Sequence, residues 1–103
     1  MTGAALVVTT VDSEAEAERI ARALVEADLV ACAQITPVRS LYRWNGKVED
    51  AREYRIDLKI RVADYADVER ALLKLHPYEI PEIVLFDIAA GLRPYLDWLA
   101  ARV

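Results

Sequence analysis

The stretch 40-SLYRWNGKVE-49 decides the fold, because its centre is the strongest turn signal in the chain. Asn45-Gly46 is the preferred residue pair of a two-residue type I′ hairpin turn, in which both central residues need positive φ. A turn of this length fixes the register of its two strands and sets Trp44 opposite Lys47. The stretch therefore predicts a β-hairpin whose pairing extends outward residue by residue.

The strand after the turn agrees with this register. Residues 53–62 alternate apolar and charged side chains, as a half-buried strand does. On one face the register pairs apolar residues: Ile35 with Ile56, Ala33 with Leu58 and Ala31 with Ile60. On the other face it sets Gln34 opposite Asp57 and Cys32 opposite Lys59. Pro37 lacks an N–H and is a candidate for a β-bulge, which would reverse the two faces on one side of it.

The rest of the chain supplies two further strands and three helices. Residues 4–11 predict a short buried strand, and a capping box at Ser13 and Glu16 starts a helix over 13–28. Asp64 caps a second helix, which stops at His76 because the residue before a proline is driven out of the helical region. Residues 83–86 predict a buried strand, and Pro94 suits the first turn of a last helix.

This order is β-α-β-β-α-β followed by a helix. It predicts the α+β class and a ferredoxin-like fold in one domain over residues 1–103. We expect helices to cover one face of a four-stranded antiparallel sheet. A long hairpin joins its second and third strands, and an extra helix ends the chain.

The hairpin is too long for a domain of this size. Its outgoing strand, 31–44, spans about 46 Å at ~3.3 Å per residue, whereas a 100-residue globule is about 34 Å across. Its tip carries Leu41, Tyr42 and Trp44, which would favour aggregation if left in water. We therefore expect an obligate homo-oligomer with these three residues at the interface. The alternative is a strand that bends at Pro37 and folds back onto its own sheet.

The composition argues against several classes of partner. The net charge of −4 argues against a nucleic-acid partner and against docking on an anionic membrane. The single cysteine allows no intrachain disulfide, which fits a reducing compartment. Neither a signal peptide nor a membrane-spanning run is recognisable, so we expect a soluble cytoplasmic protein.

The stretch 75-LHPYEIPEI-83 is the main candidate for a functional site. His76, Glu79 and Glu82 offer an imidazole and two carboxylates, and Cys32 could add a thiolate, so a site for Cu²⁺ or another divalent cation is one interpretation. The spacing falls short of a zinc site, which needs three or four ligands. The structural interpretation is at least as good: His76 ends a helix, two prolines stiffen the turn, and both glutamates are either solvated or paired with an Arg or Lys of a neighbour.

Two other side chains are candidates for a ligand cleft. Lys59 could hold an anion, or form a cross-strand ion pair with Asp57 or Glu53 of a neighbour. Tyr78 could offer its hydroxyl to the same cleft, or simply pack its ring.

Other functional classes lack their sequence features. No Gly-rich phosphate loop, nucleophile elbow or pair of catalytic groups is recognisable, so we predict neither an enzyme nor an organic cofactor. An RNA-binding sheet would need more aromatics than residues 54–62 carry. A metallochaperone would need paired cysteines, and the chain has one.

Several of these stretches together resemble the CutA family, named for divalent-cation tolerance. The resemblance runs nearly from end to end and rests on 23-ALVEADLVACAQI-35, 40-SLYRWNGKVE-49, Glu53 followed by 58-LK-59, 76-HPYEIPEI-83, and Gly91 followed by 95-YLDWL-99. It implies a ferredoxin-like fold, a tight homotrimer and similarity to the trimeric PII signalling proteins. It also implies divalent metal binding, copper above all, centred on His76. The chain departs from the common pattern at Gln34 and Ile60.

From the residues and this resemblance we expect a non-enzymatic homotrimer of divalent metal tolerance. Metal ions or a small ligand would bind in the clefts between subunits. The alternative is a PII-like signalling trimer that senses a small molecule.

Overall fold

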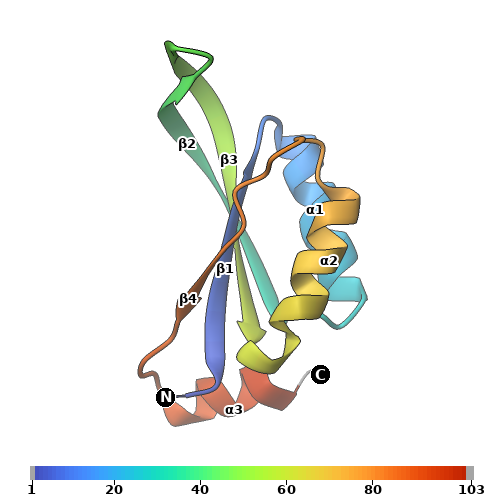
Figure 1. The fold of residues 1–103 in the computed structure, drawn as a ribbon. Coiled ribbons are helices and arrows are strands. Elements are labelled where there is room, and N and C mark those ends of the chain that lie inside the picture. Colours follow the sequence, from blue (N-terminus) through green and yellow to red (C-terminus); the bar gives the residue numbers. More distant parts are fainter. Residues whose placement is uncertain (1, 102–103) are drawn as a thin grey trace.

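The computed structural model describes residues 2–101, so the outermost three positions of the expected 1–103 domain lie outside the described residues. Its elements follow the expected order (Figure 1). They are β1 (Ala4–Val11), α1 (Glu14–Glu26), β2 (Cys32–Trp44), β3 (Lys47–Arg61), a 3₁₀ turn (Val62–Asp64), α2 (Tyr65–Leu75), β4 (Val84–Asp87) and α3 (Arg93–Ala101).

The four strands form one antiparallel sheet in the order β2-β3-β1-β4. Figure 1 shows α1 and α2 side by side on one face of this sheet. The core lies between these layers and is built from the alternating inward residues of β1 and β3 and the inner stripes of the two helices. The expected α+β, ferredoxin-like arrangement is confirmed.

The hairpin has the predicted register along its whole length. Trp44 lies opposite Lys47, Ile35 opposite Ile56 and Cys32 opposite Lys59. Asn45 and Gly46 have φ of 50° and 76°, as the type I′ turn requires. The bulge considered at Pro37 is absent, because Pro37 pairs directly with Tyr54 and the register continues unchanged beyond it. Proline is tolerated there because β2 is an edge strand.

The helix ends agree with the sequence in part. The Oγ of Ser13 accepts a hydrogen bond from the N–H of Glu16 at 3.1 Å, as predicted. The Glu16 carboxylate does not complete the capping box but pairs with Arg19. The predicted cap at Asp64 is wrong at the level of the side chain, since its carboxylate pairs with Arg61, at 2.9 and 3.0 Å, and bonds no helical N–H.

The prediction of a buried strand at 83–86 is wrong in its burial. The strand forms as β4, but all four of its residues are exposed. β4 lies at the edge of the sheet and pairs with β1 alone, so a neighbouring strand covers it on one side only. The local apolar run could not tell an edge strand from a central one.

The last helix, α3, lies across the end of the sheet farthest from the hairpin tip (Figure 1). Leu96 and Leu99 are buried there against Ala4, while Tyr95 and Trp98 remain exposed. Residues of β1 alternate between faces, and Ala4 has the opposite parity to the core residue Ala5. So α3, the expected extra helix, contacts β1 from the sheet face opposite the core, whereas α1 and α2 cover one face as expected.

The hairpin extends beyond the body of the protein, as expected from its length. The molecule measures 45 × 25 × 22 Å, and Figure 1 shows the paired ends of β2 and β3 projecting from it. Leu41, Tyr42 and Trp44 are all exposed. The strand therefore does not fold back onto its own sheet. None of the helices between residues 2 and 101 is both long and apolar enough to cross a membrane.

We predict that Gly46→Ala destabilises the protein by about 1 kcal/mol, because a side chain disfavours the positive φ of 76° at this residue. A Cβ there would meet no atom within 4 Å, so the cost comes from the backbone and not from a clash. The control is Gly46→Asn, since asparagine tolerates this region and should cost only a few tenths of a kcal/mol. Urea unfolding measures both, and equal losses for the two variants would contradict the assigned turn.

Candidate functional site

His76 is the residue at which the candidate site begins. It ends α2 with an extended backbone, φ −77° and ψ 133°, as its position before Pro77 requires. Its N–H still bonds the carbonyl of Leu72 at 2.8 Å. This geometry turns the side chain inward, where only 9% of the residue remains exposed.

Both ring nitrogens of His76 have partners in this chain. Nε2 lies 3.0 Å from the carbonyl oxygen of Thr10 and 3.0 Å from Oγ1 of Thr9. Nδ1 accepts a hydrogen bond from the N–H of Tyr78 at 3.1 Å. A carbonyl only accepts and an amide N–H only donates, so the proton lies on Nε2 and the imidazole is neutral.

The surroundings of His76 favour this neutral form. Burial lowers the pKa of the imidazole, against the Thr10 carbonyl and the more distant Glu16, Glu53 and Asp12, which raise it. An imidazolium would also lose the bond from Tyr78 N–H, because a protonated Nδ1 cannot accept. The ring is therefore held as a neutral link between β1 and the segment after α2.

Tyr78 extends the network to β3. Its hydroxyl donates a hydrogen bond of 2.6 Å to Oε2 of Glu53, a carboxylate only 7% exposed. Burial and the adjacent Glu53 carboxylate raise the pKa of this phenol well above its ordinary value, so the hydroxyl keeps its proton. The Tyr78 and His76 rings lie 4.9 Å apart at a tilt of 56°. Glu53 sits where the hairpin leaves the body, so the contact ties the post-helix segment to the hairpin base.

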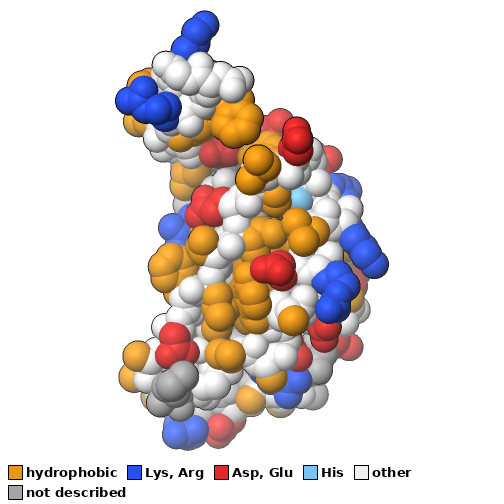
Figure 2. All heavy atoms as spheres, viewed as in Figure 1, with side chains coloured by type: hydrophobic (Ala, Val, Ile, Leu, Met, Phe, Trp, Pro, Cys, Tyr) orange, Lys and Arg blue, Asp and Glu red, His pale blue; other side chains and the backbone are white. Residues whose placement is uncertain are grey.

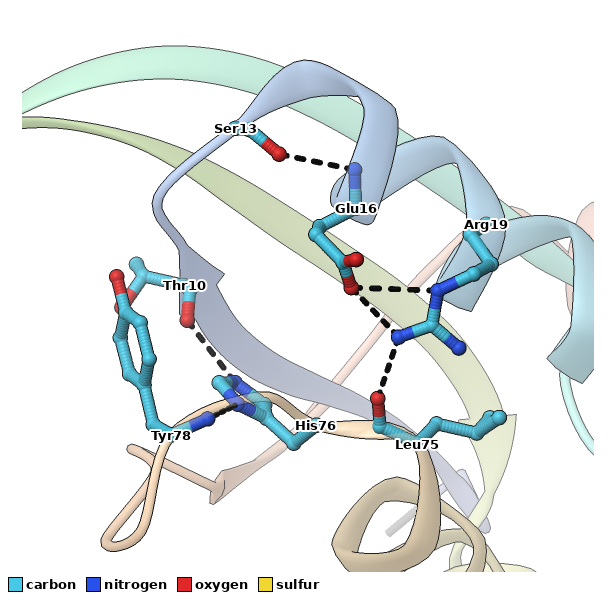
Figure 3. A network of polar contacts seen from close by, with 7 residues as sticks. All are labelled: Thr10, Ser13, Glu16, Arg19, Leu75, His76 and Tyr78. Atoms are coloured by element: carbon cyan, nitrogen blue, oxygen red, sulfur yellow. Dashed lines mark hydrogen bonds and ion pairs between the residues drawn. The ribbon is translucent and has the colours of Figure 1, made fainter.

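A second set of contacts holds the end of α2 from α1. Figure 3 shows Arg19 between Glu16 and the carbonyl of Leu75, and the same view shows Thr10, His76 and Tyr78 in sequence. The Arg19 guanidinium donates to the Leu75 oxygen at 2.6 Å and thereby satisfies a carbonyl at the helix end. Two elements thus fix the position of His76.

The remaining metal candidates do not gather around His76 within one chain. Glu79 and Glu82 are exposed and form no ion pair or hydrogen bond with the described residues. No group of three or more His, Cys, Asp and Glu residues between positions 2 and 101 could hold a metal ion. The four predicted metal ligands therefore do not form one cluster within the described residues of a single chain.

Cys32 and Lys59 lie on the other side of the sheet. They are directly opposite each other in the hairpin, with the opposite parity to the core residues Leu58 and Ile60. The Lys59 ammonium lies 5.6 Å from the centre of the Tyr95 ring, a cation–π contact. His76 contacts the buried Thr9 on the helix-covered face, so the sheet separates it from Cys32. Tyr78, the other cleft candidate, bonds Glu53, which has the same parity as Lys59 but lies six residues from it along β3.

From the sequence, Glu53 was expected only as a possible ion-pair partner for Lys59 of a neighbouring copy, and its bond to Tyr78 was not expected. Nothing local pointed to Thr9 or Thr10, which contact His76 across 66 and 67 positions of the chain.

The lowered pKa of His76 predicts a loss of stability in mild acid. The pKa in the folded state lies below the ordinary 6.5, so the unfolded chain binds the proton first. The contribution of the neutral His76 imidazole to the unfolding free energy is complete above pH 6.5 and is lost as the pH falls from there. We expect the unfolding free energy to drop by about 1 kcal/mol from pH 7.5 to 5.5. His76→Gln removes the chain's only histidine and should flatten this slope in urea titrations; an unchanged slope would contradict the assignment.

Removing the Tyr78 hydroxyl should leave the buried Glu53 carboxylate without its partner. We predict that Tyr78→Phe costs about 2 kcal/mol of unfolding free energy, because a hydrogen bond to a charged group is lost in a buried place. Tyr65→Phe is the matched control, since its 2.7 Å bond to Glu69 lies within one helix, and it should cost about 0.5 kcal/mol. Equal losses in guanidinium unfolding would show that Glu53 does not depend on Tyr78.

Comparison with known proteins identifies the family. Residues 5–102 match the family described as CutA1 divalent ion tolerance protein. The chain is 44% identical over 95 residues to a divalent-cation tolerance protein CutA from Thermus thermophilus, and the match covers 91% of this chain and 92% of that protein.

Solved structures agree with the fold. The structure of CutA from Synechococcus elongatus superposes with a TM-score of 0.96 at 36% identity, over 99% of this chain and 91% of that one. That of a periplasmic divalent cation tolerance protein CutA from Archaeoglobus fulgidus gives 0.93 at 36% identity, over 96% and 97%. The sequence, the register of the hairpin and the whole architecture lead to one conclusion: this chain belongs to the CutA1 divalent ion tolerance family.

Proposed function

We propose that this protein is a non-enzymatic homotrimer of divalent metal tolerance, built from single CutA-like domains over residues 1–103. Its metal ion or small ligand binds in the clefts between subunits. One observation carries this proposal, namely the projecting hairpin with Leu41, Tyr42 and Trp44 exposed. A chain of this size does not keep such a surface in water without a partner.

The assembly follows from the sheet edges as well. Among residues 2–101, no strand pairs with the outer side of β2 or of β4, and the β4 residues Val84, Leu85 and Phe86 are exposed. A closed ring of copies covers both edges without leaving a free end. The number three comes from the family resemblance.

The metal part of the proposal rests on the names of the relatives and on the exposed donors. Relatives from Thermus thermophilus and Archaeoglobus fulgidus are named divalent-cation tolerance proteins. Glu79 and Glu82 offer free carboxylates, and Cys32 of a second copy offers a thiolate, a set suited to Cu²⁺. His76 joins the site when its Nδ1 releases the Tyr78 N–H, at a cost of about 1 kcal/mol.

One observation favours the alternative, a PII-like trimer that senses a small molecule. Both nitrogens of His76 are already bonded, so the imidazole needs no metal to satisfy it. In that case the inter-subunit cleft would take an organic ligand, with Lys59 and the Tyr78 hydroxyl as polar contacts. We place the protein in the cytoplasm because its single cysteine fits a reducing compartment, although the Archaeoglobus fulgidus relative is named periplasmic.

Copper titration by calorimetry tests the metal site. We expect saturable Cu²⁺ binding by the assembled protein, and affinity at least tenfold weaker in the double variant Glu79→Gln/Glu82→Gln, because carboxylate ligands are replaced by poor ones. His76→Ala should also weaken binding at least tenfold. The control is Glu14→Gln/Glu26→Gln, which removes two exposed carboxylates from the ends of α1.

The outcomes separate the two candidate functions. Unchanged copper affinity in both site variants removes the metal site and leaves the small-molecule trimer. If only the glutamate variant loses copper affinity, His76 is not a copper ligand and its role is to end α2.

A further inference from the structure

The register divides the projecting hairpin into two faces of different chemistry. One face carries Tyr42, Trp44, Lys47 and Glu49, which the register places side by side. Residues of the other parity form what we call the cationic hairpin face: Arg39, Leu41, Arg43, Val48, Asp50 and Arg52. The first face is aromatic and electrically balanced. The second carries three cations, one anion and two apolar side chains.

The hairpin and the body carry opposite net charge. Residues 38–52 hold four cations and two anions, a net +2, while the whole chain has −4, so the remainder carries −6. Figure 2 shows Lys and Arg side chains on the projecting hairpin and Asp and Glu side chains at the adjoining end of the body. Opposite potentials of this kind draw surfaces together.

Within the cationic hairpin face, one arginine has no acidic partner among the described residues. Arg39 and Arg52 lie directly opposite each other, an arrangement that costs stability between like charges. Arg39 is paired with Asp50, at 2.6 and 2.9 Å, whereas Arg52 makes no ion pair with any residue between positions 2 and 101. The two arginines line a shallow recess with Pro37, Val38 and Asp50. Leu41 and Val48, each 64% exposed, lie beside it.

The segment Glu79-Ile80-Pro81-Glu82, which we call the acidic loop, has the complementary chemistry. Ile80 is 75% exposed, the highest value among the large exposed hydrophobic residues. Glu79 and Glu82 flank it and have no cationic partner among the described residues. The acidic loop, with an apolar side chain between two acids, is therefore complementary to the cationic hairpin face, where two apolar side chains lie beside two arginines.

The acidic loop does not reach the cationic hairpin face of its own chain. Tyr78 is fixed to Glu53 at the hairpin base, and His76 is fixed to β1. Pro77 and Pro81 restrict the backbone between them. With the loop held in this way, none of its acids pairs with Arg52 of the same chain.

We propose that the acidic loop of one copy docks on the cationic hairpin face of the next, with Ile80 against Leu41 and Val48 and the glutamates on Arg52 and Arg39. This rests on the proposed assembly and names the surface that each hairpin receives. A head-to-tail contact of this kind closes into a ring under three-fold symmetry. It leaves the aromatic face with Tyr42 and Trp44 free to pack elsewhere in the assembly.

The contact also completes the site at the loop. Each carboxylate has two oxygens, so a glutamate that accepts from a neighbour's arginine keeps one oxygen for a metal ion. Outer partners of this kind orient metal-ligating carboxylates. The loop glutamates of one copy are then held by the arginines of a second copy.

Charge reversal tests the docking in the metal-free protein. Sedimentation equilibrium gives the dissociation constant for the wild type, Arg52→Glu and Glu79→Lys/Glu82→Lys. We expect each reversal to weaken each interface about fivefold, hence assembly on the order of a hundredfold over three interfaces. Ile80→Ser should weaken assembly with no change of charge.

Matched controls change the same charge elsewhere. Arg93→Glu lies on α3, at the end of the molecule away from the hairpin, and Glu18→Lys/Glu26→Lys lies on exposed positions of α1. Both controls should leave the dissociation constant within about threefold of the wild type. If Arg52→Glu behaves as Arg93→Glu does, the docking is wrong while the assembly stands. If the wild type is itself monomeric, the assembly and the docking both fail.

Mixing the two reversed proteins shows whether the contact lies between copies. In mixed assemblies the glutamate introduced by Arg52→Glu meets the lysines introduced into the loop, so the mixture should associate roughly tenfold more tightly than either variant alone. A triple variant, Arg52→Glu/Glu79→Lys/Glu82→Lys, carries both reversals in the same chain and should associate more tightly than either reversed variant. Recovery of the triple variant without recovery of the mixture would place the contact within one chain and overturn the inference.

Discussion

The structure depends on the two-residue turn at Asn45-Gly46, which forces β2 and β3 to pair without a break along the 13 residues of β2. Because the register is fixed at the turn, the strands continue past the end of the body and carry their side chains into solvent. The inner half of the hairpin builds the core with α1 and α2. The outer half has no core of its own, and the proposed assembly would supply its stability.

The His76 network gives this overhang a fixed base. His76 links the end of α2 to β1, and Tyr78 carries the link on to Glu53, where β3 leaves the body. The polar groups of this network are mutually satisfied, and no buried side-chain nitrogen or oxygen of the described residues lacks a partner. A fully bonded network of this kind rigidifies its surroundings. The direction of the hairpin and the position of the acidic loop are therefore set by the same contacts.

Local chemistry explains which features the sequence could predict. The hairpin register followed from one turn and a period of two, and the end of α2 followed from Pro77, because each depends on neighbouring residues. The burial of β4 was mispredicted, since being at a sheet edge is a property of the topology and not of the strand. The Asp64 carboxylate, which was predicted to cap α2, pairs with Arg61 instead. The partners of His76 lie more than sixty residues away, so no spacing rule could separate a metal ligand from a residue that ends a helix.

Membership of the CutA1 family settles the fold, and the overhanging hairpin supplies the physical reason for an assembly. The exposed apolar residues, the unpaired sheet edges and the opposite charges of hairpin and body all favour contact with a neighbouring copy. The most direct measurement is the mass of the wild-type protein in solution by light scattering at micromolar concentration. The account predicts about 35 kDa, three times the 11.6 kDa of one chain. A stable, soluble species of 11.6 kDa, with Tyr42 and Trp44 still in water, would contradict it.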